Sequence, residues 1–219
     1  NIFNANGIVT IYSEGKCINE WHLRPLKKGT ARLAIKAWEE NIPLRVLPVG
    51  INYNSFRLFG KNVFINLGEM ITKENIEQSE ADGLRHLSFN NRLQKQFEQL
   101  VFEIPKQDYH QQRKQLTVNI SLAKRLILFI PAIPGLLINA PLYLPIKKFS
   151  LHRTKGTDHF DSVIAGILLL IYPIYLLLLA VLLLALTKNY LSLTIILFAP
   201  FTAWCYVQIK KQTDRKILH

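Results

Sequence analysis

Cysteine is almost absent from this chain of 219 residues, which has only Cys17 and Cys205. Two cysteines so far apart provide neither a disulfide framework nor the repeated spacing of a zinc site. Small domains stabilised by disulfides and small domains stabilised by zinc are therefore excluded. Cys17 falls in a predicted loop, where one interpretation is a reactive thiol. We favour a small apolar loop residue, because no neighbouring feature of the sequence promotes the thiolate form.

Acidic residues are also scarce, with 15 Asp and Glu against 27 Lys and Arg and a net charge of +12. Such a balance is compatible with nucleic-acid binding. No zinc spacing, nucleic-acid motif or row of stacking aromatic residues supports that partner, however. Residues 126–219 carry 9 basic and 3 acidic residues, nearly all outside long apolar runs. We therefore expect the positive charge to lie beside anionic lipid head groups, with membrane lipids as partners and no nucleic acid.

Charge is missing altogether from residues 163–186, a run long enough to cross a bilayer as a helix. Residues 191–207 form a shorter apolar run with Trp204 and Tyr206 near its end, as is typical of interfacial anchors. The two runs predict a transmembrane helical hairpin. A buried soluble helix pair is disfavoured because residues 163–186 carry no charge, and a small transporter subunit because they contain almost no polar residues.

A third apolar stretch, residues 126–144, is interrupted by Pro131, Pro134 and Pro141. Each half is too short to cross a bilayer. Basic residues flank both ends, at Lys124, Arg125, Lys147, Lys148, Arg153 and Lys155. Because positive charge prefers the cytoplasmic side, we predict a re-entrant or interfacial helical hairpin with both ends cytoplasmic. The same rule places the C-terminal charges inside, at Lys210, Lys211, Arg215 and Lys216.

Residues 1–104 have the pattern of an α/β domain, and residues 105–125 that of a polar linker. The predicted elements are a strand at 8–13, a loop at 14–29, a helix at 30–41, strands at 44–51 and 63–67, and a helix at about 84–103. Pro43 and Pro105 end the two helices. The continuous apolar run at Val46 and Leu47 is typical of a strand buried on both faces, so we expect a largely buried sheet.

A carboxylate and a glycine, Glu14 and Gly15, follow the first predicted strand, where α/β folds place ligands. Glu14 either orients a polar substrate or ties down its own loop, and we favour the second role with substrate nearby. Gly15 permits a close backbone approach. His22 is a possible base, although a lone loop histidine is more often solvent-facing. A basic set provides charge-assisted bonds for a phosphate, or a solvated face toward the membrane: Lys16, Arg24, Lys27 and Lys28.

Four segments occur in a family-like order: Tyr-Ser-Glu-Gly at 12–15, Pro-Leu-Lys-Lys-Gly at 25–29, an apolar run reaching Pro-Val at 48–49, and a later strand-like run at 63–71. Over residues 8–104 the chain resembles the glycerolipid acyltransferases. That family has Phe-Pro-Glu-Gly-Thr-Arg-Ser after a strand, Phe-Lys-Lys-Gly before a helix, an apolar strand reaching Pro-Val, and a later strand ending in Gly-x-Pro-Ile. The family's Thr and Arg are Lys16 and Cys17 here.

The resemblance implies transfer of an acyl chain, from acyl-CoA or acyl-carrier protein, to a hydroxyl of glycerol 3-phosphate or 1-acylglycerol 3-phosphate. It implies no cofactor beyond the acyl donor. Glu14, Gly15, Lys16, Arg24, Lys27 and Lys28 are the expected substrate-binding residues, and the basic ones would take the phosphate-holding role of the family's missing Arg. An integral membrane protein with its catalytic domain on the cytoplasmic face is expected.

The family's catalytic His-x4-Asp pair does not occur in these 219 residues. His152 and Asp158 come closest, but with the wrong spacing and between predicted membrane segments. In the family the pair lies upstream of Glu-Gly, so we expect it before Asn1, and we interpret the chain as a C-terminal fragment that is inactive alone. A non-catalytic, membrane-anchored lipid-binding or scaffold protein is the open alternative.

Overall fold

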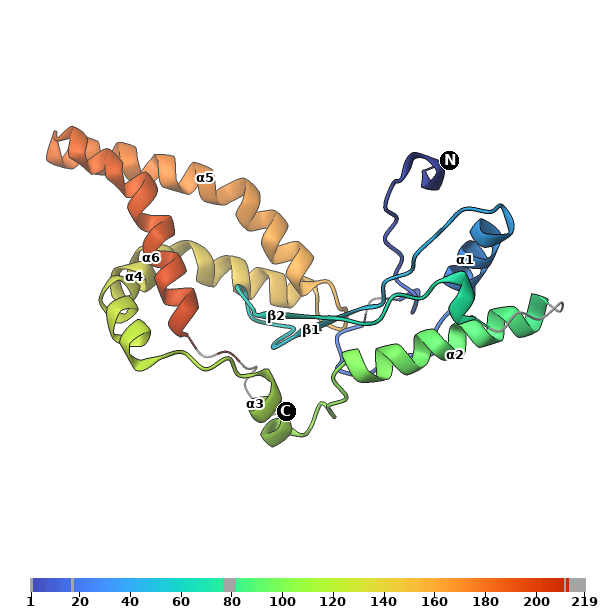
Figure 1. Cartoon of the computed structure of the whole chain (residues 1–219). Coiled ribbons are helices and arrows are strands. Elements are labelled where there is room, and N and C mark those ends of the chain that lie inside the picture. The colour runs from blue at the N-terminus through green and yellow to red at the C-terminus, as the bar shows by residue number, and fades with distance from the viewer. Residues whose placement is uncertain (1, 17, 77–81, 211, 213–219) are drawn as a thin grey trace. The chain divides into compact units, whose positions relative to one another are not determined.

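The computed structural model describes residues 2–16, 18–76, 82–210 and 212, and it is mostly helical (Figure 1). Cys17 and the C-terminal Lys211, Arg215 and Lys216 lie outside the described residues. The chain divides into two units. The first comprises residues 1–53 and 63–112, and the second comprises residues 54–62 and 113–219.

Two amphipathic helices build the core of the first unit: α1 (Gly29–Glu39) and α2 (Asp82–Leu100). Both were predicted within a few residues, because apolar positions recur with the helical period. Trp38 of α1 and Phe89 of α2 pack edge to face, with ring centroids 6.0 Å apart. The buried residues of this core are Ala31, Ala34, Ile35, Trp38, Ile71, Ile76, Phe89 and Leu93.

The sheet is smaller than the sequence predicts. In the described part of the first unit it has two antiparallel strands, β1 (Val49–Tyr53) and β2 (Val63–Leu67), with Ile51 opposite Ile65. The strand predicted at 63–67 is confirmed, whereas β1 begins later than the predicted 44–51. Val46 pairs with Ile71 in an isolated bridge instead.

One face of this sheet is covered by the end of α2, and the other is exposed. Asn52 and Asn66 both donate to the carbonyl of Leu100, at 2.9 and 2.7 Å. On the opposite face Ile51 and Ile65 are exposed. The expected largely buried α/β sheet is therefore wrong for the described residues, because burial on both faces needs additional strands and a second covering layer.

The strand predicted at 8–13 is also wrong. Residues 7–12 are not in a strand, and Ile8 and Tyr12 are exposed. An apolar, β-favouring run forms a strand only when a neighbour supplies the ladder hydrogen bonds. Among the described residues, no strand pairs with residues 8–13.

The second unit contains helices that are long and apolar. They are α4 (Leu122–Arg153), α5 (Phe160–Thr187) and α6 (Ile195–Ile209), with the 3₁₀ helix η3 (Tyr190–Thr194) before α6. The polar α3 (Tyr109–Leu116) lies within the predicted linker. Among the described residues, three segments are long and apolar enough to cross a membrane: Leu122–Arg153, Phe160–Thr187 and Tyr190–Ile209.

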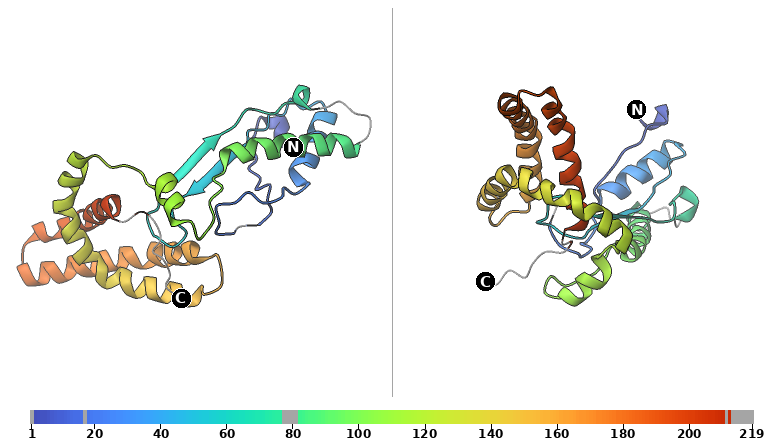
Figure 2. Two further views of the ribbon diagram at one scale, coloured as in Figure 1. Left: turned by 90° about the horizontal axis from the view of Figure 1, so that it is seen from below. Right: turned by 90° about the vertical axis from the view of Figure 1, so that its left-hand side faces the viewer.

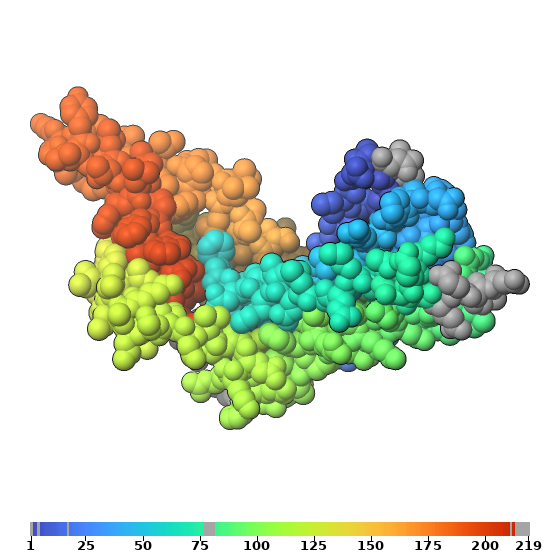
Figure 3. All heavy atoms as spheres, viewed as in Figure 1, coloured from blue at the N-terminus to red at the C-terminus, as the bar shows by residue number. Residues whose placement is uncertain are grey.

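The surfaces of these helices are apolar, as expected of an integral membrane protein. Leu178 of α5 and Leu197 of α6 are among many exposed leucines. Figure 3 shows α5 and α6 in orange and red, with much of their surface uncovered. In water such a surface would be costly, whereas lipid chains are as apolar as leucine. The helices predicted at 163–186 and 191–207 coincide with α5 and with the segment from η3 to α6.

Residues 126–144 are not a hairpin of two short helices. They belong to the single helix α4, which contains Pro131, Pro134, Pro141 and Pro145 and is sharply bent between its two halves (Figures 1 and 2). Proline removes one backbone donor and kinks a helix without necessarily ending it. Close packing on α6 supports the bent form: a Cβ at Gly135 would lie 2.1 Å from the Thr202 carbonyl oxygen.

Candidate functional site

The loop before α1 is closed on itself by its two ends. The Ser13 carbonyl accepts from the Lys27 amide at 2.7 Å, and Glu14 Oε1 accepts from the Arg24 amide at 2.9 Å. The buried hydroxyls of Ser13 and Thr30 share a hydrogen bond of 3.0 Å, which ties the loop to the first turn of α1. Glu14 therefore has the loop-stabilising role that the sequence favours.

Gly15 lies against Lys27, with its backbone in the left-handed region at φ +67°. Its amide donates to the Tyr12 carbonyl at 3.1 Å, which closes a turn. A Cβ at this position would lie 3.1 Å from Lys27 Cγ. Glycine is favoured here because other residues pay a steric cost for positive φ, and because the stem of Lys27 approaches so closely.

The four predicted basic residues fall into two groups. Arg24 pairs through Nε with Glu20, four residues earlier in the loop, and this hydrogen bond holds the pKa of the Glu20 carboxyl below its usual value. Lys16, Lys27 and Lys28 are exposed. Arg24 is thus part of the loop's internal structure, and the three lysines are the groups that face solvent.

The N-terminus of α1 has the properties of an anion site. Lys28 is its N-cap residue, no side chain caps it, and its first turn contains no acidic residue. A Cβ added at Gly29 would meet nothing within 4 Å, so the backbone there is accessible. The exposed Gly29 and the helix dipole favour negative charge at this end, although Thr30 and Ala31 of the first turn are buried. Lys27 and Lys28 add two positive charges at the same place.

Glu103 is a loop anchor that sequence reasoning missed. Its Oε1 accepts from the Leu23 amide at 2.8 Å, and its Oε2 lies 2.7 Å from His22 Nδ1. Next to it, the Ile104 amide donates to the Trp21 carbonyl at 2.9 Å. A partner 80 residues away has no local signature in the sequence. His22 is exposed in this pair, and its position on the surface gives no support to the role of catalytic base.

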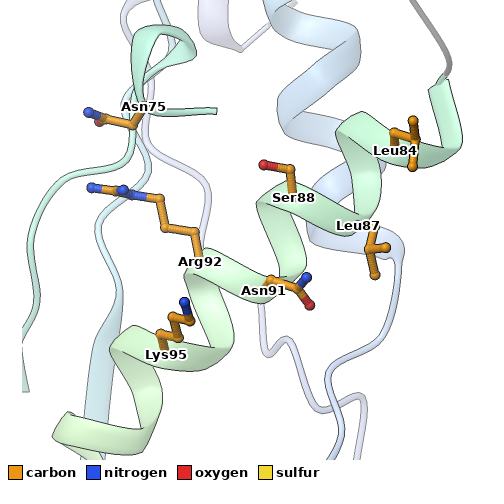
Figure 4. Close-up of a pocket in the computed structure, with 7 residues that line it drawn as sticks. All are labelled: Asn75, Leu84, Leu87, Ser88, Asn91, Arg92 and Lys95. Carbon is orange, nitrogen blue, oxygen red and sulfur yellow. The ribbon is translucent and has the colours of Figure 1, made fainter. Parts of the chain in front are cut away.

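Two shallow pockets flank α2 in the first unit. One adjoins the loop and is lined by His22, Leu23, Pro25, Leu26, Asn90, Asn91 and Gln94. The other is lined by Asn75, Leu84, Leu87, Ser88, Asn91, Arg92 and Lys95, and there Arg92 extends from α2 toward Asn75 (Figure 4). Neither of these two is lined by Glu14 or by the exposed Lys16, Lys27 and Lys28.

The remaining chemistry of the chain is sparse. Within the described ranges, no three His, Cys, Asp or Glu side chains form a group that could hold a metal ion, and Cys205 is a buried free thiol. No protein-family model, curated protein or solved structure matches the chain. The candidate site is therefore defined by its own geometry: the closed loop 13–27 and the cationic N-terminus of α1.

Proposed function

We propose that the chain is part of a membrane-bound acyltransferase of phospholipid biosynthesis, with the catalytic side on the cytoplasmic face. Its acceptor would be glycerol 3-phosphate or 1-acylglycerol 3-phosphate, and its donor acyl-CoA or acyl-carrier protein. The observation that carries the proposal is the loop that presents Lys27 and Lys28 at the uncapped N-terminus of α1. The apolar helices, which suit a lipid product, and the four family-like segments support it.

In this proposal the acceptor's phosphate binds at the start of α1. Lys27 and Lys28 supply charge-assisted hydrogen bonds, and the amide of the exposed Gly29 supplies a further donor. Glu14 and Gly15 act indirectly, since they fix the loop from which Lys27 projects. These 219 residues contain no His-x4-Asp pair to deprotonate the acceptor hydroxyl, so we expect acceptor binding but no acyl transfer by this chain alone.

The double variant Lys27→Ala/Lys28→Ala tests the phosphate site. We expect its affinity for glycerol 3-phosphate, measured by isothermal titration calorimetry on the detergent-solubilised chain, to fall on the order of tenfold to a hundredfold, because two charged contacts are lost. Lys36→Ala is the matched control, since Lys36 is exposed in the last turn of the same helix. Equal affinity of wild type and the double variant would remove the phosphate site from the proposal.

Glu14→Ala tests the loop's contribution. The change removes the acceptor of the Arg24 amide, so we expect acceptor affinity to fall roughly tenfold and hydrogen exchange at the Arg24 amide to accelerate. Glu14→Gln keeps an oxygen acceptor and should recover much of both. Full affinity in Glu14→Ala, with faster exchange at Arg24, would show that the loop's order does not matter for binding.

A second candidate is a non-catalytic, membrane-anchored lipid-binding or scaffold protein. It is favoured by the lack of a His-x4-Asp pair in the 219 residues and by the engagement of Glu14 with its own loop. Translation of the coding sequence upstream of Asn1 discriminates the two. An in-frame His-x4-Asp pair supports the acyltransferase, and a reading frame without it supports the non-catalytic protein.

A further inference from the structure

The segment 54–62, which connects β1 to β2, belongs to the second unit and is fastened there. Asn54 Oδ1 accepts from the Asn62 amide at 2.8 Å, which closes the segment, and Asn54 Nδ2 donates to the Gln212 carbonyl at 2.8 Å. Gly60 has φ +65°, and a Cβ there would lie 2.4 Å from Val207 Cγ1 of α6. The tip of the segment therefore lies directly against the end of α6.

The ammonium groups of Lys147 and Lys210 both lie near this tip. Lys210, which follows α6, donates through Nζ to the Phe59 carbonyl. Lys147 of α4 holds its Nζ 5.9 Å from the ring centroid of Tyr143, and the rings of Tyr143 and Phe59 are 6.2 Å apart. Lys147 thus lies over the Tyr143 ring of this aromatic pair, and Lys210 contacts the backbone carbonyl of Phe59, which supplies the other ring.

Among the described residues, the charges at this place have no ion-pair partner. The nearby Lys61 pairs with Asp161, so that carboxylate is engaged. Over the described ranges, no ion pair involves Lys147 or Lys210. Burial and, as the smaller cause, the charge of Lys147 together lower the pKa of Lys210 to about 8. Two half-buried like charges raise the free energy of the apo protein, and a bound anion would offset that cost.

Both lysines lie near the end of an apolar segment. Lys210 comes directly after the apolar segment Tyr190–Ile209, and Lys147 follows the apolar run of α4. Exposed apolar side chains precede both, with Leu144 on α4 and Phe201 and Trp204 on α6. The ends of apolar membrane segments lie near the lipid phosphates of a bilayer, and basic pockets between membrane helices are known to bind anionic head groups.

We propose that Lys147 and Lys210, beside the Phe59–Tyr143 ring pair, bind the phosphate of an anionic phospholipid whose acyl chains lie along the exposed surfaces of α4 and α6. The site is separate from the loop before α1, and it does not depend on the proposed acyltransferase function. Segment 54–62 contributes the Phe59 carbonyl and ring, so lipid binding would also hold this segment against α6.

Thermal unfolding of the full chain in a non-ionic detergent tests the site. Tryptophan fluorescence is followed while dihexanoyl phosphatidylglycerol is titrated, with dihexanoyl phosphatidylcholine and sodium phosphate in parallel. We expect phosphatidylglycerol to raise the Tm of wild type, and the other two to raise it much less. In Lys147→Gln/Lys210→Gln the apparent affinity for phosphatidylglycerol should fall on the order of tenfold or more, since two charged contacts are lost.

Three further proteins make the test specific. Lys148→Gln removes an exposed charge next in sequence to Lys147 and should bind like wild type. Lys147→Arg/Lys210→Arg keeps both charges and should retain binding, and the single variant Lys147→Gln gives a measurable loss if the double variant does not fold. Unchanged affinity in the neutral variants, or an equal loss in Lys148→Gln, would overturn the proposal. Equal stabilisation by phosphatidylcholine or by inorganic phosphate would overturn the assignment to an anionic lipid.

Discussion

Phe89→Ala is expected to lower the free energy of unfolding of the first unit by about 3–5 kcal/mol, the usual cost of removing a buried aromatic ring and leaving a cavity. Phe89 is fully buried between the helices, where it meets Trp38 edge to face and packs in the cluster with Ile71 and Leu93. Urea denaturation followed by tryptophan fluorescence measures the change, because the buried Trp21 and Trp38 belong to this unit.

Leu87→Ala is the matched control for this prediction. Leu87 lies two residues away on the same helix, but its side chain is exposed, so its truncation should change stability by only about 0.5 kcal/mol. If the loss in Phe89→Ala were no larger than in Leu87→Ala, α1 and α2 would not share the core described above.

Gly135→Ala should destabilise the packing of α4 on α6. The added methyl group would lie 2.1 Å from the Thr202 carbonyl oxygen and 3.0 Å from the Ala203 amide nitrogen, and both are backbone atoms that cannot rotate away. Helices in lipid rely on small residues for such close approach. We expect a loss of about 1–3 kcal/mol, as for other overpacked contacts. For a chain of this size that lowers the Tm by roughly 2–4 °C per kcal/mol.

Gly166→Ala is the control, because it makes the same change in α5 at a position where a Cβ meets nothing within 4 Å. Its stability should stay within about 1 kcal/mol of wild type, or rise, since alanine has the higher helix propensity. Thermal unfolding of both variants in one detergent gives the comparison. Equal Tm values would contradict the close approach of α4 and α6 at Gly135.

The parts of the candidate site that are close together in the sequence could be predicted, and the distant part could not. Glu14, Gly15, Lys27 and Lys28 fall within 15 residues of one another, and a short loop before a helix was enough to predict that they gather. Glu103 also anchors this loop, but it follows α2 in the sequence, 80 residues after the Leu23 amide that it accepts from. Arg24 was predicted to face a phosphate, and its engagement with Glu20 is decided by side-chain geometry that spacing does not specify.

By itself, the sequence determined α1, α2, α5 and the membrane character of this protein. Apolar periodicity predicted α1 and α2, and uncharged length predicted α5, because both depend on neighbours within a few turns. Only the tertiary structure decided the sheet and α4. A strand forms only when a neighbouring strand supplies its ladder hydrogen bonds. Residues 63–67 pair with β1, whereas residues 8–13 lie outside the sheet. Prolines predicted a break in α4, yet close packing on α6 supports one bent helix, since local preferences of a few kcal/mol yield to packing over a long interface.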